Sequence, residues 1–234
     1  MSKRNPNEKR QTDPILCLVV DRGAVSGDLK SCVAAAVGAG VDWVQIRERS
    51  LEGAELLAHA EEINRAARQA AAQRGADVKV IVNRRVDIAL ELGANGVQLG
   101  FGAVDPGTAR RLLGDEALIG ISAHHPDEIR TAAPEVDYAQ LAAIFRPLSK
   151  PRAGPFLGVQ AVEEAARHDI PVIAQGGITP ANATAVAVAG AAGVAVTGAI
   201  LSAPDPAAAT RALRGALAAA RPSHPRVLPP ASPI

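Results

Sequence analysis

Three polar residues at alternate positions, Gln45, Arg47 and Arg49, lie at the end of a short apolar run. Side chains in a strand alternate between its two faces, so all three can point the same way. A guanidinium group binds two oxygens at once and suits phosphate or carboxylate. The spacing therefore predicts an anion-binding face. The alternative is a solvated Arg49 and an Arg47 that pairs with an acidic neighbour.

Two glycine-containing segments late in the chain, Gly176-Gly177 and Thr197-Gly198, offer a second way to bind an anion. Glycine lets the backbone approach a ligand closely, and backbone N–H groups at helix N-termini bind phosphate. We expect these four residues to hold a phosphate group. Ordinary turn glycines are the alternative.

His124 and Ser122 share one parity at the end of another apolar run. The ordinary pKa of imidazole lies near neutrality, which makes His124 a candidate general acid and base. No nucleophile elbow surrounds Ser122, so we expect it to form hydrogen bonds. Lys150 lies in a segment rich in Pro and Gly, 146–158, which could be a lid over the site or a solvated loop.

Carboxylates are few near these polar residues. Mg²⁺ usually binds one or two carboxylates together with phosphate oxygens. Glu48 has the opposite parity to Arg47, and Asp105 precedes a proline as a helix cap would. We therefore expect arginine, lysine and backbone N–H groups to bind the anion, with no metal.

The elements that must position these residues alternate between short apolar runs and longer helical segments. The expected strands are Ile15–Val20, Trp43–Arg47, Val78–Val82, Gly96–Leu99, Leu118–Ser122, Tyr138–Ala142, Val172–Gln175 and Gly193–Val196. The expected helices are Leu29–Ala39, Ala54–Arg74, Arg85–Leu92, Pro106–Leu113, Asp127–Ala133, Val159–His168, Asn182–Ala189 and Pro206–Ala220.

Repeated alternation of strand and helix indicates parallel strands joined by crossover helices. Eight such units in 234 residues favour an α/β fold of one domain, a (β/α)₈ TIM barrel. A doubly wound sheet is the alternative, but the first turn, Asp21–Val25, lacks the GxGxxG fingerprint of that fold. Barrels carry their chemistry at the C-terminal ends of the strands, where the polar residues above lie.

The composition excludes several classes of partner. The chain is 48% apolar, and its 25 Lys and Arg against 24 Asp and Glu give no basic excess for nucleic acid. No apolar run is long enough to cross a membrane, and the polar N-terminus does not resemble a signal peptide. Cys17 and Cys32 carry no CxxC pairing, which favours a reducing compartment. We expect a cytoplasmic monomer or homo-oligomer, with a barrel at 14–221 between disordered tails at 1–13 and 222–234.

Several segments, in their order along the chain, resemble the thiamine phosphate synthase superfamily, which also contains the thiazole tautomerases. These segments are Val44–Arg49, Ile81–Ala89, Gly96–Gly100, Gly120–His124 and Gln175–Thr179. The resemblance covers the chain from about Ile15 to Ala220. It implies a barrel that binds a thiazole phosphate, which a synthase joins to a pyrimidine pyrophosphate with the help of Mg²⁺.

The resemblance also implies roles for individual residues. It assigns pyrophosphate contacts to Gln45, Arg47 and Arg49, although the family usually has lysine at position 49. It assigns contact with the pyrimidine to Asn83 and closure over the pyrophosphate to Lys150. It assigns contact with the thiazole phosphate to Gly177.

Three departures from the synthase pattern point to the tautomerase branch. Arg84 and Ala103 stand where synthases carry metal-binding aspartates, and Gln98 replaces their usual histidine. We therefore predict a tautomerase, an isomerase that needs no cofactor, with His124 as proton carrier. Ser122 or Gln98 would orient the ring, and Arg47 would bind a substrate carboxylate. The alternatives are a synthase, which would need Mg²⁺, and a non-catalytic barrel that binds a phosphorylated metabolite.

Overall fold

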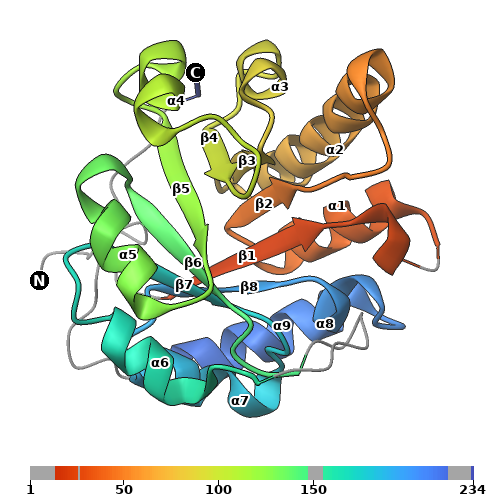
Figure 1. Ribbon diagram of the computed structural model, residues 1–234. Helices are drawn as coiled ribbons and strands as arrows, with labels where there is room; N and C mark the ends of the chain where they lie inside the picture. Colours follow the sequence, from red (N-terminus) through yellow and green to blue (C-terminus); the bar gives the residue numbers. More distant parts are fainter. Residues whose placement is uncertain (1–13, 26, 147–154, 221–232) are drawn as a thin grey trace, which may run out of the picture.

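The computed structural model describes residues 14–25, 27–146, 155–220 and 233–234. In this part of the chain, eight parallel strands close into a barrel in which each strand pairs with its neighbours in sequence, and β8 pairs with β1 (Figure 1). The strands are β1 (Ile15–Val20), β2 (Trp43–Ile46), β3 (Lys79–Asn83), β4 (Gly96–Leu99), β5 (Leu118–Ala123), β6 (Tyr138–Ala142), β7 (Val172–Gln175) and β8 (Gly193–Val196). The predicted (β/α)₈ barrel is confirmed, and no strand end differs from its prediction by more than one residue.

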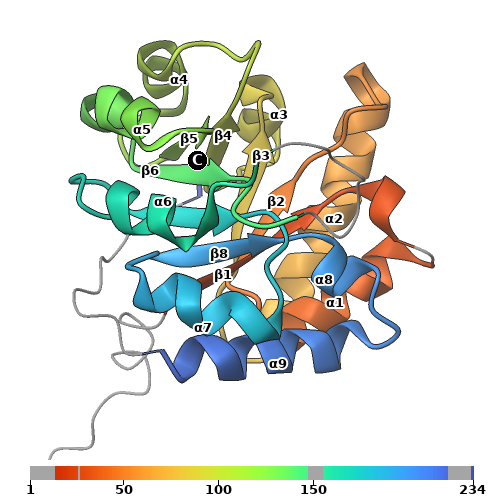
Figure 2. The ribbon, with the colours of Figure 1, turned by 60° about the horizontal axis from the view of Figure 1, so that its bottom comes forward.

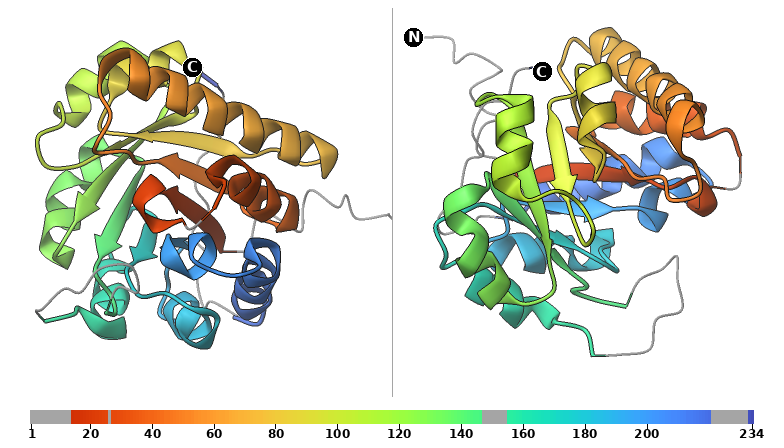
Figure 3. Two further views of the ribbon diagram at one scale, coloured as in Figure 1. Left: turned by 90° about the vertical axis from the view of Figure 1, so that its right-hand side faces the viewer. Right: turned by 45° about the horizontal axis from the view of Figure 1, so that its top comes forward.

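Helices surround the barrel. They are α1 (Leu29–Ala39), α2 (Gly53–Gln73), α3 (Val86–Glu91), α4 (Pro106–Leu113), α5 (Pro126–Ala132), α6 (Gly158–Ala165), α7 (Pro180–Val188), α8 (Gly198–Leu201) and α9 (Pro206–Ala218), with short 3₁₀ turns η2 (Arg22–Ala24) and η3 (Ala133–Glu135). Figure 2 shows α1, α7 and α9 covering the outer side of β1 and β8. Helix α1 packs between α2 and α9 (Figure 3, left).

Capping residues explain where several helices begin. The carboxylates of Asp105 and Asp205 accept backbone N–H groups three residues later, at 2.8 and 2.9 Å, which confirms both as N-caps. Helix α7 begins two residues earlier than expected, because Thr179 starts it with a capping box.

Helix α6 ends three residues earlier than predicted. The N–H groups of Arg167 and His168 bond to carbonyls three residues back rather than four, so the last turn is no longer α-helical. The four-residue helix α8 was not predicted, since such a short segment gives no periodic signal.

Inward side chains fill the barrel in layers of four, each layer drawn from alternate strands by the strand register. Near the N-terminal end, Trp43 and Tyr138 meet edge to face, with ring centroids 5.1 Å apart. A Cβ on Gly120 would lie 2.2 Å from the Tyr138 ring, so only glycine fits there. The next layer, with Ile81 and Ile173, is also apolar, and the layers above it carry polar side chains that lead to the C-terminal mouth of the barrel.

The cysteine thiols and the two described C-terminal residues lie away from this mouth. Cys17 and Cys32 are buried free thiols. The predicted tails lie outside the described residues, apart from Pro233 and Ile234, and the N–H of Ile234 donates to the carbonyl of Ala94, two residues before β4. None of the helices in the described ranges combines the length and the apolar character needed to cross a membrane.

Candidate active site

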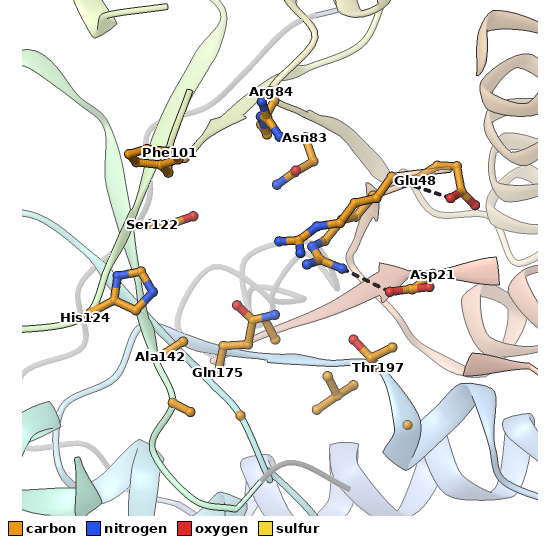
Figure 4. Close-up of a pocket in the computed structure, with 18 of the residues that line it drawn as sticks. Asp21, Glu48, Asn83, Arg84, Phe101, Ser122, His124, Ala142, Gln175 and Thr197 are labelled. Carbon is orange, nitrogen blue, oxygen red and sulfur yellow. Dashed lines mark hydrogen bonds and ion pairs between the residues drawn. The ribbon is translucent and has the colours of Figure 1, made fainter. Parts of the chain in front are cut away.

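A pocket of about 860 Å³ opens at the C-terminal ends of the strands (Figure 4). Its lining comes from every strand end or the loop that follows it. Figure 4 shows Arg84, Asn83 and Phe101 along one side, with Gln175 and Thr197 along another. The prediction that polar residues gather at this end of the barrel is therefore confirmed.

Arg47 lines the pocket just beyond the end of β2. Its guanidinium donates to the carboxylate of Asp21, which follows β1, at 3.0 Å. Burial lowers the pKa of Arg47, and so does the nearby charge of Arg49, while Asp21 opposes both effects. Arg47 thus lines the pocket, as an anion-binding face would require, and it also pairs with an acidic neighbour. Each of the two interpretations of the sequence describes part of its environment.

Glu48 turns toward its own loop instead of the pocket centre. Its Oε1 accepts the backbone N–H groups of Arg49 and Ser50, at 2.7 and 2.9 Å, and the Ser50 hydroxyl at 2.8 Å. Burial alone would raise the pKa of Glu48, but these hydrogen bonds lower it below its ordinary value. The carboxylate therefore stays ionised and shapes the loop, while the exposed Arg49 lines the pocket.

Arg84 follows Asn83 at the end of β3 and is the non-glycine residue of the described chain with a positive φ, +66°. This left-handed conformation costs a residue with a Cβ about 1 kcal/mol. The Arg84 guanidinium donates to the carbonyl of Gly102, in the loop after the neighbouring strand β4, at 3.5 Å. The neighbouring Arg85 instead pairs with Asp87, where its Nε donates at 2.8 Å.

Ser122 and His124 line the pocket from the end of β5, and both are exposed. Figure 4 shows the His124 ring facing the pocket. The backbone N–H of His124 donates to Glu128 at 2.8 Å, which fixes the backbone that carries the ring. Gln98 lies beneath and donates from Nε2 to the Ser122 hydroxyl at 3.1 Å.

Three buried glutamines form a layer below the pocket wall. Gln45, Gln98 and Gln140 are at most 2% exposed, and Nε2 of Gln45, Oε1 of Gln98 and Nε2 of Gln140 have no hydrogen-bond partner in the described residues. Gln45 and Gln98 were expected to contact a ligand. The structure places them one layer deeper than Asn83 and Ser122, because successive layers come from alternate sets of strands and rise by one residue.

The glycines at the end of β7 are required by packing. Gly176 and Gly177 have φ values of +98° and +63°. A Cβ on Gly177 would lie 2.4 Å from the carbonyl oxygen of Arg146, and one on Gly176 would lie 2.8 Å from Ala143. Both glycines also line the pocket, as do Thr197 and Gly198 at the start of α8, so the turn role and the ligand role are compatible.

Lys150 lies outside the described residues, so its closure over a ligand stays a prediction. Asp21 and Phe101 are among the pocket residues that the sequence analysis did not assign to the site. Asp21 directly follows β1, and the criterion applied to the other strand ends would have found it. Phe101 is fully exposed at the rim, and sequence alone does not indicate exposure of a large apolar side chain.

Comparison with known proteins identifies the family. A family model described as thiamine monophosphate synthase matches residues 16–200. The chain belongs to this family. A thiamine-phosphate synthase of Roseiflexus castenholzii is 38% identical over 202 residues, covering 85% of this chain and 86% of that protein. One from Laribacter hongkongensis is 40% identical over 202 residues, covering 86% and 90%. The solved thiamine phosphate pyrophosphorylase of Pyrococcus furiosus superposes with a TM-score of 0.74 at 26% identity, covering 89% and 97% of the two chains.

These relatives correct the predicted activity. They are named as synthases, which are transferases, so the prediction of an isomerase of the tautomerase type is wrong. The prediction gave Arg84, Ala103 and Gln98 more weight than the similarity along the whole barrel. Identity spread over some 200 residues reports on many more sites than these three positions.

The residues of this pocket do not fit the magnesium ion that the family implies. Among the described residues, no cluster of three or more His, Cys, Asp or Glu side chains could hold a metal. Three carboxylates of the described residues line the pocket, of which Asp21 is bonded to Arg47 and Glu48 to its own loop, which leaves Glu52 as the remaining candidate ligand. Mg²⁺ needs several oxygen ligands in octahedral geometry, and four of the charged side chains that line the pocket are guanidiniums, which cannot bind a cation.

Proposed function

We propose that this protein is a thiamine-phosphate synthase, which joins a hydroxymethylpyrimidine pyrophosphate to a thiazole phosphate. The observation that carries the proposal is the match of the synthase family model to residues 16–200. The relatives of that name support it, since they align over most of both chains. The cation-rich pocket mouth is consistent with substrates that carry phosphate groups.

The reaction requires positive charge around the pyrophosphate leaving group. The C–O bond between the pyrimidine methylene and the pyrophosphate breaks, and the pyrophosphate leaves with the electron pair. The thiazole nitrogen then supplies its lone pair to a new C–N bond. Fixed positive groups stabilise the negative charge that develops on the leaving group. Arg47, Arg49 and Arg84 line the side of the pocket that can serve this purpose.

The second substrate requires a phosphate site away from those arginines. Gly177, Gly198 and Thr197 line the pocket at the ends of β7 and β8, where barrels often bind phosphate. The Thr197 side chain does not cap α8, so its hydroxyl can donate to a ligand. We assign the thiazole phosphate to this part of the pocket, and we assign ligand contacts to His124 and Asn83, which face the space between the two sites.

The test is direct coupling by the purified protein. Both substrates are mixed with the protein, with Mg²⁺ in one reaction and with EDTA in another, and thiamine phosphate and pyrophosphate are measured. We expect the two products in equal amounts in at least one condition. Binding of both substrates without any product would instead identify a non-catalytic barrel and reject the proposal.

A further inference from the structure

We infer that this chain binds the pyrophosphate group through the guanidiniums of Arg49 and Arg84 and does not need a divalent cation to do so. The inference rests on the proposed function only for the choice of anion. It concerns how this pocket supplies positive charge, where the described residues do not fit a metal.

The first step concerns the carboxylates. Asp21 is bonded to Arg47, and Oε1 of Glu48 accepts three hydrogen bonds from its own loop. Asp105 lies beyond the β4 end, and both its oxygens bond to Thr108, at 2.8 and 2.7 Å. Turning any of these three carboxylates toward a metal would break a cap, a loop or an ion pair. Glu52, which directly precedes α2, is then the one remaining carboxylate of the pocket lining in the described chain.

The second step concerns the arginines. Four arginines line the pocket, Arg47, Arg49, Arg84 and Arg85. Two of them have a carboxylate partner, since Arg47 pairs with Asp21 and Arg85 with Asp87. Within the described ranges, no carboxylate pairs with the guanidinium of Arg49 or Arg84. Their charges are therefore uncompensated and face a cavity that is large enough for a ligand.

The third step concerns the position of Arg84. Its left-handed backbone and the contact with Gly102 hold the guanidinium over the gap between β3 and β4. A Cβ on Gly102 would lie 3.1 Å from that guanidinium, so glycine leaves room for it. The bond to Gly102 is long and uses one N–H group, which leaves the other donors of the fork for a ligand.

The fourth step is the chemical difference between a guanidinium and a metal ion. A guanidinium binds two phosphate oxygens and neutralises charge, whereas it cannot act as a bridging Lewis acid. Free Mg²⁺ also binds pyrophosphate and reduces its negative charge. Added Mg²⁺ should therefore weaken binding to this pocket, the opposite of its effect at a metal-dependent site.

The experiment is calorimetric titration of the full chain with inorganic pyrophosphate, in EDTA and in excess Mg²⁺. We expect binding in EDTA that weakens in Mg²⁺. Arg49→Ala and Arg84→Ala should each weaken binding in EDTA about tenfold, the usual effect of losing a charge-assisted hydrogen bond. Arg84→Lys should recover only part of the loss, because lysine keeps the charge without the fork.

Arg65→Ala is the matched control. It removes the same charge from the exposed outer face of α2, away from the mouth, and should leave pyrophosphate binding unchanged. Thermal unfolding of each variant shows whether it is folded. A wild-type chain that binds pyrophosphate only with Mg²⁺, or Arg49→Ala and Arg84→Ala variants that bind like the wild type, would overturn the inference.

The two proposals fail in different ways. If coupling proceeds only with Mg²⁺ and pyrophosphate binding requires Mg²⁺, the protein is a synthase and the inference is wrong. If pyrophosphate binds in EDTA through both arginines and no thiamine phosphate forms in any condition, the inference stands and the synthase assignment is wrong.

Discussion

At the scale of single residues, Arg84 combines a strained backbone with an uncompensated charge. Residues with a Cβ adopt positive φ at a cost, and such residues cluster at functional sites. The sequence identified Arg84 as a departure from the synthase pattern. It could not show the left-handed backbone or the contact with Gly102, because both depend on the neighbouring loop.

Replacing Arg84 with glycine should separate stability from binding. Arg84→Gly removes the steric cost of the left-handed conformation, and we expect the free energy of unfolding to rise by about 1 kcal/mol. Pyrophosphate binding should weaken in the same variant. Urea denaturation and calorimetry measure the two effects, and a less stable variant would show that the Arg84 conformation is not strained.

Phe101 is an exposed aromatic residue that we expect to contact a ligand. A fully exposed phenylalanine beside a polar pocket can pack against a planar ring. We expect Phe101→Ala to raise KM for the pyrimidine substrate roughly fivefold, with kcat and the melting temperature little changed. Leu112→Ala on α4, which removes a half-exposed side chain away from the pocket, is the control and should change neither. Equal KM values for the Phe101 variant and the wild type would exclude the contact.

At the scale of elements, the loop after β7 depends on its glycines. Gly177→Ala places a methyl group 2.4 Å from a backbone oxygen at positive φ, so we expect it to lower the free energy of unfolding by more than about 2 kcal/mol. Gly215→Ala is the matched change, because it lies exposed in α9 with nothing within 4 Å of the new Cβ.

The Gly215 variant should gain about 0.5–1 kcal/mol through higher helix propensity. Urea unfolding of both variants decides the matter. If Gly177→Ala were as stable as Gly215→Ala, the loop would have enough freedom to move away from the Arg146 carbonyl.

The positions of the elements could be predicted from the sequence more fully than the site. The strands are short apolar runs buried on both faces, so their ends are easy to find in the sequence. The starts of several helices are marked by Asp caps and prolines. The depth of Gln45 and Gln98 could not be predicted, since parity gives the face of a strand but not the layer. The partner of Arg47 was also hidden, because Asp21 is 26 residues away in sequence.

At the scale of the whole molecule, the interior should limit stability at high pH. Burial raises the pKa of Cys17 to about 12 from an ordinary value of 9.0, and burial also raises that of Tyr138. At a pH between the ordinary and the raised pKa of Cys17, the folded state keeps the thiol proton and the unfolded chain loses it. The free energy of unfolding should therefore fall above pH 9, by about 1.4 kcal/mol per pH unit from Cys17 alone.

Cys17→Ala removes that contribution. Denaturation series at rising pH should show a shallower decline for the variant than for the wild type, while Tyr138 contributes to both. Identical slopes for the two proteins would mean that the thiol titrates normally in the folded barrel.

The layered interior constrains how such a barrel can change over time. In the layer of Trp43 and Tyr138 the other two places belong to Gly96 and Gly193, so two bulky rings alternate with two residues that have no side chain. The four inward residues of a layer share one space inside the barrel. The sum of their side-chain volumes is therefore the quantity under selection. A smaller side chain on one strand leaves space for a larger side chain on another strand of the same layer. We therefore expect relatives to diverge by paired substitutions within a layer, while the mouth above keeps its shape.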